Sequence, residues 1–320
     1  MRSLSGASLT LGSIGLAATI GCSQVGMVQA RRDFKAANAA YQQQDYKKAA
    51  DLYEQTLQED PSLSKAYFYL ANSYDNQFKP SRKGDATNDG YLEKAVKNYQ
   101  MCADKLQGSA DPIDKQLATR SLEYLQAAYG ADKLNDPAKA EPIVQKMIQA
   151  DPSEPANYFV LAKLYEDAGA YPEAEEILVY AQKAKPTDPA VYMTLAGYYN
   201  RQGQFDKTIE ALEARAKVEP NNPEAFQTIA AYYWDETRGD SSLTDAKKRD
   251  YIEKGVEAAD KALSIKGDFV EAMTFKGLLL RQQALVEKDP AKQQELLKEG
   301  TALGEKANEL RKTQQKSSTN

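Results

Sequence analysis

Histidine is absent from the 320 residues of this sequence, and cysteine occurs only twice, at Cys22 and Cys102. The absence of histidine excludes a Ser-His-Asp triad, a Cys-His dyad and any metal site with histidine ligands. Two cysteines are too few for a disulfide framework or for a zinc site made of cysteine alone. We therefore expect no metal, no cofactor and no enzymatic activity.

The chain also lacks a surplus of positive charge, because 41 Lys and Arg residues face 46 Asp and Glu residues. A weakly acidic chain has no electrostatic reason to bind nucleic acid. The phosphate-binding patterns GxxxxGK[ST] and GxGxxG and the nucleophile pattern GxSxG are missing as well. These absences point away from catalysis and toward a binding protein.

The N-terminus differs in composition from the rest of the chain. Arg2 supplies a positive start, and an uncharged apolar stretch runs over residues 8–20. A membrane span needs about 20 apolar residues, so this stretch is short for one. A positive start followed by a short apolar stretch is typical of a bacterial secretory signal.

The apolar stretch ends in Thr19-Ile20-Gly21-Cys22, which resembles a bacterial lipobox, with Thr19 where leucine is usual. The resemblance implies lipidation of Cys22, a signal peptide over residues 1–21 and a short tether over 22–30. The protein would then be exported to the cell envelope and anchored in a membrane, facing the periplasm. Val28-Gln29-Ala30 offers a second possibility, cleavage after Ala30 to give a secreted soluble protein. An uncleaved anchor is the third.

Beyond this segment, the same residue types recur every 34 positions. Large and small apolar residues alternate with the three-to-four spacing of one helical face, and a proline closes each unit. The recurring sets are Pro152, Pro186 and Pro220; Ala162, Ala196 and Ala230; Tyr165, Tyr199 and Tyr233; Tyr158, Tyr192 and Phe226; Leu161, Leu195 and Ile229. A single globular core gives no reason for such a period, whereas stacked helix-turn-helix units do.

With these residues, the chain resembles tetratricopeptide repeat proteins, whose period is 34 residues, from Ala30 to Arg311. The resemblance implies an all-α fold, a right-handed α-solenoid of about seven helix-turn-helix repeats over residues 31–311. Together with the N-terminal signal, it indicates a bacterial tetratricopeptide repeat lipoprotein. Residues 312–320 are polar, and we expect them to be a disordered tail.

Three segments interrupt the repeats, at residues 77–90, 237–250 and 287–294. The first is polar and contains Pro80, Gly84 and Gly90, which predicts an exposed loop. In the second, residues 243–250 could extend the helix that follows. Insertions on one edge of a solenoid often carry function, but loops also lengthen at little energetic cost.

In tetratricopeptide proteins, the first helix of each repeat lines a concave groove that holds a protein or peptide. The positions of this chain that match the groove are Phe34, Asn38, Tyr41, Phe68, Asn72, Phe159, Lys163, Met193, Asn200 and Trp234. Exposed aromatic side chains in a concave surface are typical anchors for a partner. Asn38 and Asn72 fall at asparagine positions of carboxylate-binding members, but Phe34 stands where their clamp has lysine.

These observations predict a non-enzymatic scaffold or adaptor, exported and anchored by lipid, which binds a protein or peptide in its groove. A narrower alternative is an assembly factor of an envelope machine, such as outer-membrane protein insertion or pilus biogenesis. That alternative rests on analogy with other tetratricopeptide lipoproteins.

Overall fold

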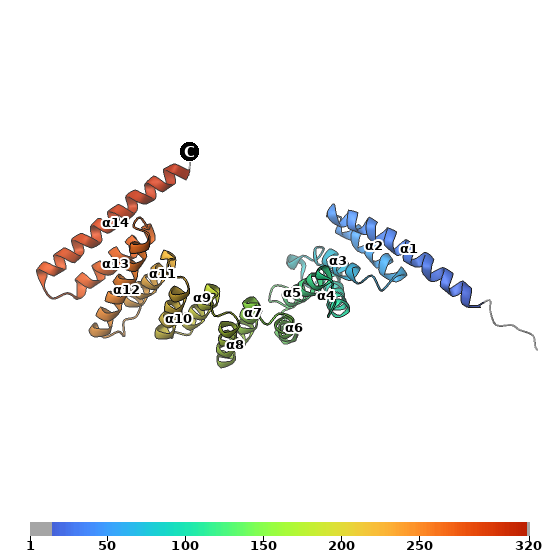
Figure 1. The fold of residues 1–320 in the computed structure, drawn as a ribbon, viewed down its shortest axis with the longest axis horizontal. Helices are drawn as coiled ribbons and strands as arrows, with labels where there is room; N and C mark the ends of the chain where they lie inside the picture. Colours follow the sequence, from blue (N-terminus) through green and yellow to red (C-terminus); the bar gives the residue numbers. More distant parts are fainter. Residues whose placement is uncertain (1–14, 319–320) are drawn as a thin grey trace, which may run out of the picture. The chain divides into compact units, whose positions relative to one another are not determined.

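The computed structural model describes residues 15–318, which form fourteen α-helices and no strand (Figure 1). The chain divides into two compact units, residues 1–152 and 153–320. The helices of the first unit are α1 (Gly15–Gln42), α2 (Tyr46–Glu59), α3 (Ser64–Asp75), α4 (Ala86–Leu106), α5 (Pro112–Ala128) and α6 (Pro137–Ala150). Those of the second are α7 (Pro155–Asp167), α8 (Tyr171–Ala184), α9 (Pro189–Arg201), α10 (Phe205–Val218), α11 (Pro223–Gly239), α12 (Asp245–Ile265), α13 (Val270–Val286) and α14 (Pro290–Ser318).

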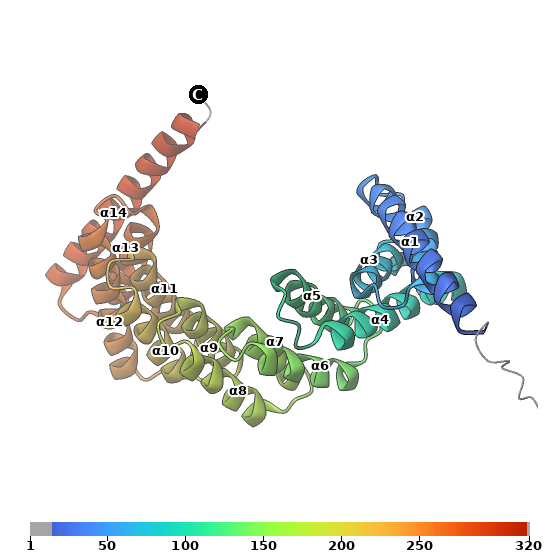
Figure 2. The same ribbon diagram turned by 45° about the vertical axis from the view of Figure 1, so that its right-hand side comes forward.

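Consecutive helices pack in pairs, and the fourteen helices make seven of them. We call the first helix of each pair helix A and the second helix B. In the second unit, the A helices α7, α9, α11 and α13 form one layer and the B helices α8, α10 and α12 form the other (Figures 1 and 2). The prediction of an all-α solenoid of about seven repeats is therefore confirmed, including the third and seventh repeats, whose patterns are weakest.

A shared sequence pattern starts the A helices α5, α7, α9 and α11. An acidic or amide residue caps the helix, and proline occupies the first helical position, where no backbone N–H is required. Glu154 accepts from the N–H of Ala156, and Asp188 and Asn222 repeat this contact 34 and 68 residues later. The recurring prolines at 152, 186 and 220 lie just before these caps, in the linkers that end each repeat.

The turns within the repeats need left-handed backbone. Gly169 and Gly203 have φ angles of 76° and 67° between their A and B helices. Gln44 takes the same conformation in the first repeat, with φ 62°, although a side chain there is strained. The turn therefore keeps its left-handed backbone in the first repeat, where glutamine stands in place of glycine.

Small residues allow each pair to pack closely. Ala162, Ala174 and Ala181 are almost completely buried in the fourth repeat. Glycines replace them in the last pair, where a Cβ atom on Gly277 would lie 2.8 Å from the carbonyl oxygen of Gly300. The backbones of α13 and α14 thus approach each other more closely than side chains would allow.

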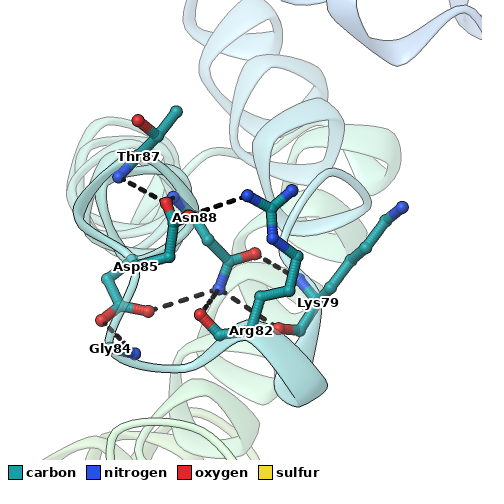
Figure 3. Close-up of polar contacts among 7 residues, drawn as sticks. Lys79, Arg82, Gly84, Asp85, Thr87 and Asn88 are labelled. Carbon is teal, nitrogen blue, oxygen red and sulfur yellow. Dashed lines mark hydrogen bonds and ion pairs between the residues drawn. The ribbon is translucent and has the colours of Figure 1, made fainter.

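The insertion at residues 77–90 is more ordered than the exposed loop that the sequence predicts. It contains a single 3-10 turn, Pro80–Arg82, and its last residues already belong to α4. Asn88 is buried, accepts a hydrogen bond from the N–H of Lys79 and donates to the carbonyl oxygens of Lys79 and Arg82 (Figure 3). Asp85 caps α4 through the N–H groups of Thr87 and Asn88.

The other insertions lengthen helices. Residues 237–239 end α11 and residues 245–250 begin α12, as the sequence suggested for the second half of that segment. The third insertion is a short linker followed by the start of α14.

The ends of the repeat region differ from their predictions. Helix α14 continues to Ser318, so residues 312–318 are helical where we expected a disordered tail. The segment is rich in lysine and glutamine, which favour helix, and it extends a helix that is already nucleated. The tether predicted at 22–30 lies within α1, whereas residues 1–14 and 319–320 lie outside the described part of the chain.

Candidate protein-binding surface

Tyrosine and asparagine side chains from the A and B helices of the first two repeats form a network of hydrogen bonds and ring contacts. The hydroxyl of Tyr53 donates to Asn38 Oδ1 at 2.6 Å, and that of Tyr41 donates to Asn72 Oδ1 at 2.7 Å. Asn72 Nδ2 in turn donates to the hydroxyl of Tyr99 at 3.1 Å. The hydrogen bonds from Tyr41 to Asn72 and from Asn72 to Tyr99 link the first two repeats, and the stacking of Tyr124 on Tyr99 adds the third.

Burial determines how this network titrates. Desolvation, with Tyr46 as the next cause, raises the pKa of Tyr41 above its usual value. Desolvation also raises the pKa of Tyr99, with a further contribution from the Asp75 carboxylate. Both hydroxyls therefore stay protonated around neutral pH and can keep donating hydrogen bonds.

A cleft of about 410 Å³ opens where α3 and α5 meet the start of α2 and the loop after α5. The side chains that line it are Tyr46, Asn72, Asp75, Asn76, Tyr124 and Lys133. Tyr124 is 37% exposed and stacks on Tyr99 with the ring centroids 5.1 Å apart and the planes 5° apart. The cleft thus has a rigid aromatic wall supported by the core.

An ion pair closes one side of the cleft. Lys133 Nζ lies 2.6 Å from Asp75 Oδ1, and the two side chains are 19% and 9% exposed. Because the charges neutralise each other, the cleft is polar without a net charge. Asn76 Nδ2 donates to the side-chain and main-chain oxygens of Asn72.

Three polar atoms of the cleft remain available. The Asn76 amide oxygen and the hydroxyls of Tyr46 and Tyr124 make no hydrogen bond with another described residue. A carbonyl oxygen accepts and a phenol both donates and accepts. This combination suits the alternating N–H and C=O groups of an extended peptide.

The structure distributes the predicted groove residues of the first unit between core and surface. Phe68 and Asn72 are only 5% and 6% exposed. Phe34, Asn38 and Tyr41 are partly buried, and Phe34 packs on Tyr53 with the ring centroids 5.8 Å apart. Most of these side chains hold neighbouring repeats together. Asn72 lines the cleft, and Tyr41 and Phe68 contact aromatic residues that line it.

The predicted residues of the second unit lie on three successive A helices. Lys163 on α7 and Asn200 on α9 are exposed, whereas Phe159, Met193 and Trp234 are partly buried. Met193 Sδ accepts a hydrogen bond from Arg215 at 3.0 Å, and Lys163 pairs with an aspartate one turn further along α7. Arg238 lies over the Trp234 ring, 4.8 Å from its centroid.

Ion pairs also join the repeats on this surface. Arg201 on α9 donates two hydrogen bonds to Glu166 on α7, at 2.7 and 2.9 Å. These hydrogen bonds, with the positive charge of Arg201, hold the pKa of the Glu166 carboxyl below its usual value. The second unit therefore also presents paired charges, which here join the A helices of neighbouring repeats.

The positional pattern missed Tyr46, Asn76, Tyr124 and Lys133. The third repeat matches the consensus poorly, so its Tyr124 gave no signal of a groove position. Lys133 is 58 residues from its partner Asp75, and no local pattern connects them.

The described residues give no sign of a metal site or a membrane span. No group of three or more cysteine or acidic side chains among them could hold a metal ion. None of their helices has an apolar stretch long enough to cross a bilayer.

Comparison with known families agrees with the repeat geometry. A tetratricopeptide repeat model matches residues 133–198 and 167–232, and a second model with the same description matches residues 34–84. The chain is a tetratricopeptide repeat protein. Its family is typically a non-enzymatic protein-interaction fold, in which stacked helix pairs present an extended surface to other proteins.

A solved structure with a TM-score above 0.5 supports the fold. The C-terminal part of a tetratricopeptide protein from Cytophaga hutchinsonii is 15% identical and matches 87% of this chain and 98% of its own, with a TM-score of 0.52. A tetratricopeptide protein from Parabacteroides merdae is 15% identical over 85% of this chain and 99% of its own, with a TM-score of 0.45. YrrB, described as having an unusual peptide-binding site, is 16% identical over 60% and 88%, with a TM-score of 0.38. No curated protein matches the sequence.

Proposed function

We propose that this protein is a non-enzymatic scaffold that holds an extended segment of a partner protein in the cleft of its first unit, and that a lipid on Cys22 tethers it to a membrane of the cell envelope. The observation that carries the binding proposal is the cleft between Tyr46 and Tyr124. It combines a rigid aromatic wall, available hydrogen-bonding atoms and a neutralised ion pair.

The chemistry of the cleft favours main-chain recognition. Lys133 and Asp75 satisfy each other, so neither is left as an uncompensated charge that would select a charged ligand. Asn76 and the two tyrosine hydroxyls can pair with peptide N–H and C=O groups, while the rings pack on apolar side chains. The ligand class is therefore an extended, uncharged peptide with at least one apolar side chain.

Packing near the N-terminus supports processing at Cys22 over cleavage after Ala30. Ala30 is fully buried, and a Cβ atom on Gly26 would lie 3.5 Å from the carbonyl oxygen of Glu59. Cleavage after Ala30 would remove residues that pack against α2 and expose the apolar surface they cover. Cleavage before Cys22 leaves this packing intact.

Site-specific photo-cross-linking in the native cell tests the binding proposal. The probe, a benzophenone amino acid, replaces Tyr124, where another aromatic side chain can keep the stacking on Tyr99. The control position is Glu93 on α4, an exposed residue of a B helix in the same unit. A discrete partner captured from Tyr124 and not from Glu93 is the expected result.

A second probe pair separates the two units. Phe159 lies on the A-helix layer of the second unit, and Glu176 is an exposed residue of its B helix α8. Capture from Phe159 with none from Tyr124 would move the binding surface to the second unit. Equal capture from the A and B helices would contradict a dedicated binding surface.

A further inference from the structure

The first helix carries a mixed apolar and basic face in the middle of its length. Val28 is 70% exposed and Met27 41% exposed, so two adjacent large apolar side chains meet solvent on this helix. Arg31, Arg32 and Lys35 follow within two turns and are all exposed. None of these three cations forms an ion pair with another described residue.

Helix geometry places these side chains together. At 100° per residue, Val28, Arg31, Arg32 and Lys35 fall within a sector of about 100°, which we call the outer face of α1. The buried Ala30 and an alanine two turns later lie on the opposite side, where α1 packs against α2. No repeat precedes α1 in the described chain to cover the outer face.

The acidic groups of this region lie away from the outer face. Asp33 is turned about 140° from Val28 along the helix and accepts hydrogen bonds from Gln29 at 3.0 and 3.1 Å. Glu59 is its neighbour at the end of α2, where burial and Asp33 raise the pKa of the Glu59 carboxyl. The three cations of the outer face thus lie apart from the carboxylates of Asp33 and Glu59.

We infer that the outer face of α1 lies against an anionic lipid surface. The exposed Val28 would enter the headgroup region, and Arg31, Arg32 and Lys35 would pair with lipid phosphates. This inference rests on the proposed tether, because Val28 and Arg31 follow Cys22 by about 9 and 14 Å of helix. At that distance the cations lie within roughly one to two Debye lengths of the membrane to which Cys22 would be attached.

The uneven distribution of charge around α1 also determines which side of the helix faces the lipid. An anionic surface attracts the basic outer face and repels the side that carries Asp33 and Glu59. If the charges served only to keep a terminal helix soluble, cations and carboxylates would not have to lie apart. Val28 and Met27 would also not have to be exposed beside the cations. The partner that fits best is therefore a lipid surface and not a second protein.

A single fluorescent probe can test the contact on the full chain purified from its native membrane. Cys102 is buried, so a cysteine introduced by Val28→Cys takes an environment-sensitive dye selectively once Cys22 carries lipid. The protein is reconstituted in vesicles of phosphatidylcholine alone or mixed with phosphatidylglycerol. We expect a blue shift of the dye only with phosphatidylglycerol, and its reversal by added salt.

Matched double variants identify the residues. Arg31→Gln/Arg32→Gln should weaken the contact equilibrium on the order of 30-fold, since each cation near an anionic surface contributes about fivefold. Lys47→Gln/Lys48→Gln, which removes two exposed cations from α2, should leave the shift unchanged. An equal shift in phosphatidylcholine, or a shift that survives the loss of both arginines, would overturn the lipid contact.

The mass of the same purified chain separates this inference from the tether. An unmodified Cys22 would refute lipidation. In that case the dye experiment is repeated with Cys22→Ala added, so that only the cysteine at position 28 is labelled. A blue shift that depends on phosphatidylglycerol would still show that α1 contacts lipid. A lipidated chain without the shift would refute the contact alone.

Discussion

Replacing Gly277 by alanine should force α13 and α14 apart. The new Cβ atom would lie 2.8 Å from the carbonyl oxygen of Gly300, and that atom belongs to a backbone that cannot rotate away. Arg281 also donates to this oxygen at 3.2 Å, so a shift of α14 would weaken a hydrogen bond as well. Overpacking of this kind costs about 1–3 kcal/mol.

Gly277→Ala also has a favourable effect on stability, the higher helix propensity of alanine, and a control variant must cancel it. Alanine is preferred over glycine in a helix interior by about 0.5–1 kcal/mol. Gly197 in α9 provides a matched control, because its Cβ would meet only the end of the Arg201 side chain, at 3.3 Å, and no backbone atom. Gly197→Ala should therefore be less destabilising than Gly277→Ala, and the two variants should differ by about 1–3 kcal/mol.

Trp234 is the only tryptophan of the chain and lies on α11, in the same unit as both glycines. Urea unfolding followed by its fluorescence reports the second unit directly. With a slope of about 2 kcal/mol per molar urea, the midpoints of the two variants should differ by roughly 0.5–1.5 M. A Gly277→Ala midpoint equal to or above that of Gly197→Ala would refute the argument from close backbone approach.

Three further outcomes are expected. Lys133→Met should destabilise the loop after α5 by about 1.5–3 kcal/mol, the range for a hydrogen bond to a charged group, measured as faster hydrogen exchange over residues 129–136. Arg201→Gln should make the acid destabilisation of the second unit shallower. The pKa of Glu166 is depressed in the folded state, so its stabilisation is present above the usual glutamate pKa and is lost as the pH falls through the folded value. Cys22→Ala should release the protein from the membrane or trap its precursor, seen by fractionation.

For each of these three predictions, one result would contradict the reasoning. Lys97 on α4 is exposed and forms no ion pair with another described residue, so Lys97→Met should leave the exchange unchanged. An equal effect of both lysine variants would contradict a specific role for Asp75. If the stability of the second unit depends on pH in the same way with and without Arg201, Arg201 does not stabilise the ionised form of Glu166. Unaltered fractionation and processing after loss of Cys22 would remove the lipid tether.

The fold was predictable because the same sequence pattern occurs in several repeats. Each 34-residue unit carries the same small and aromatic positions, so the period of the neighbouring units also predicts a repeat whose own pattern is weak, as for α5 and α6. The insertion at 77–90 was harder to predict. Its order depends on Asn88, whose side chain reaches back to Lys79 and Arg82, and a polar composition alone looks like a flexible loop.

The candidate site was less predictable than the fold. The period places a residue on a face of its own helix, but the exposure of that residue depends on side chains from the next repeat. Phe68 faces the predicted groove, yet Tyr69, Tyr99 and Tyr124 pack around its ring and bury it. Lys133 enters the cleft from a loop whose path follows from tertiary packing, which no local pattern contains.

Helix α1 runs without a break from before Cys22 into the first repeat. A flexible linker over residues 22–30 would let the solenoid explore a radius of about 16 Å in every direction. The same nine residues as a helix span about 13 Å along one axis. A protein held by a lipid on Cys22 would therefore keep the orientation that α1 takes on the membrane, and a pull on its bound partner would reach the membrane without slack.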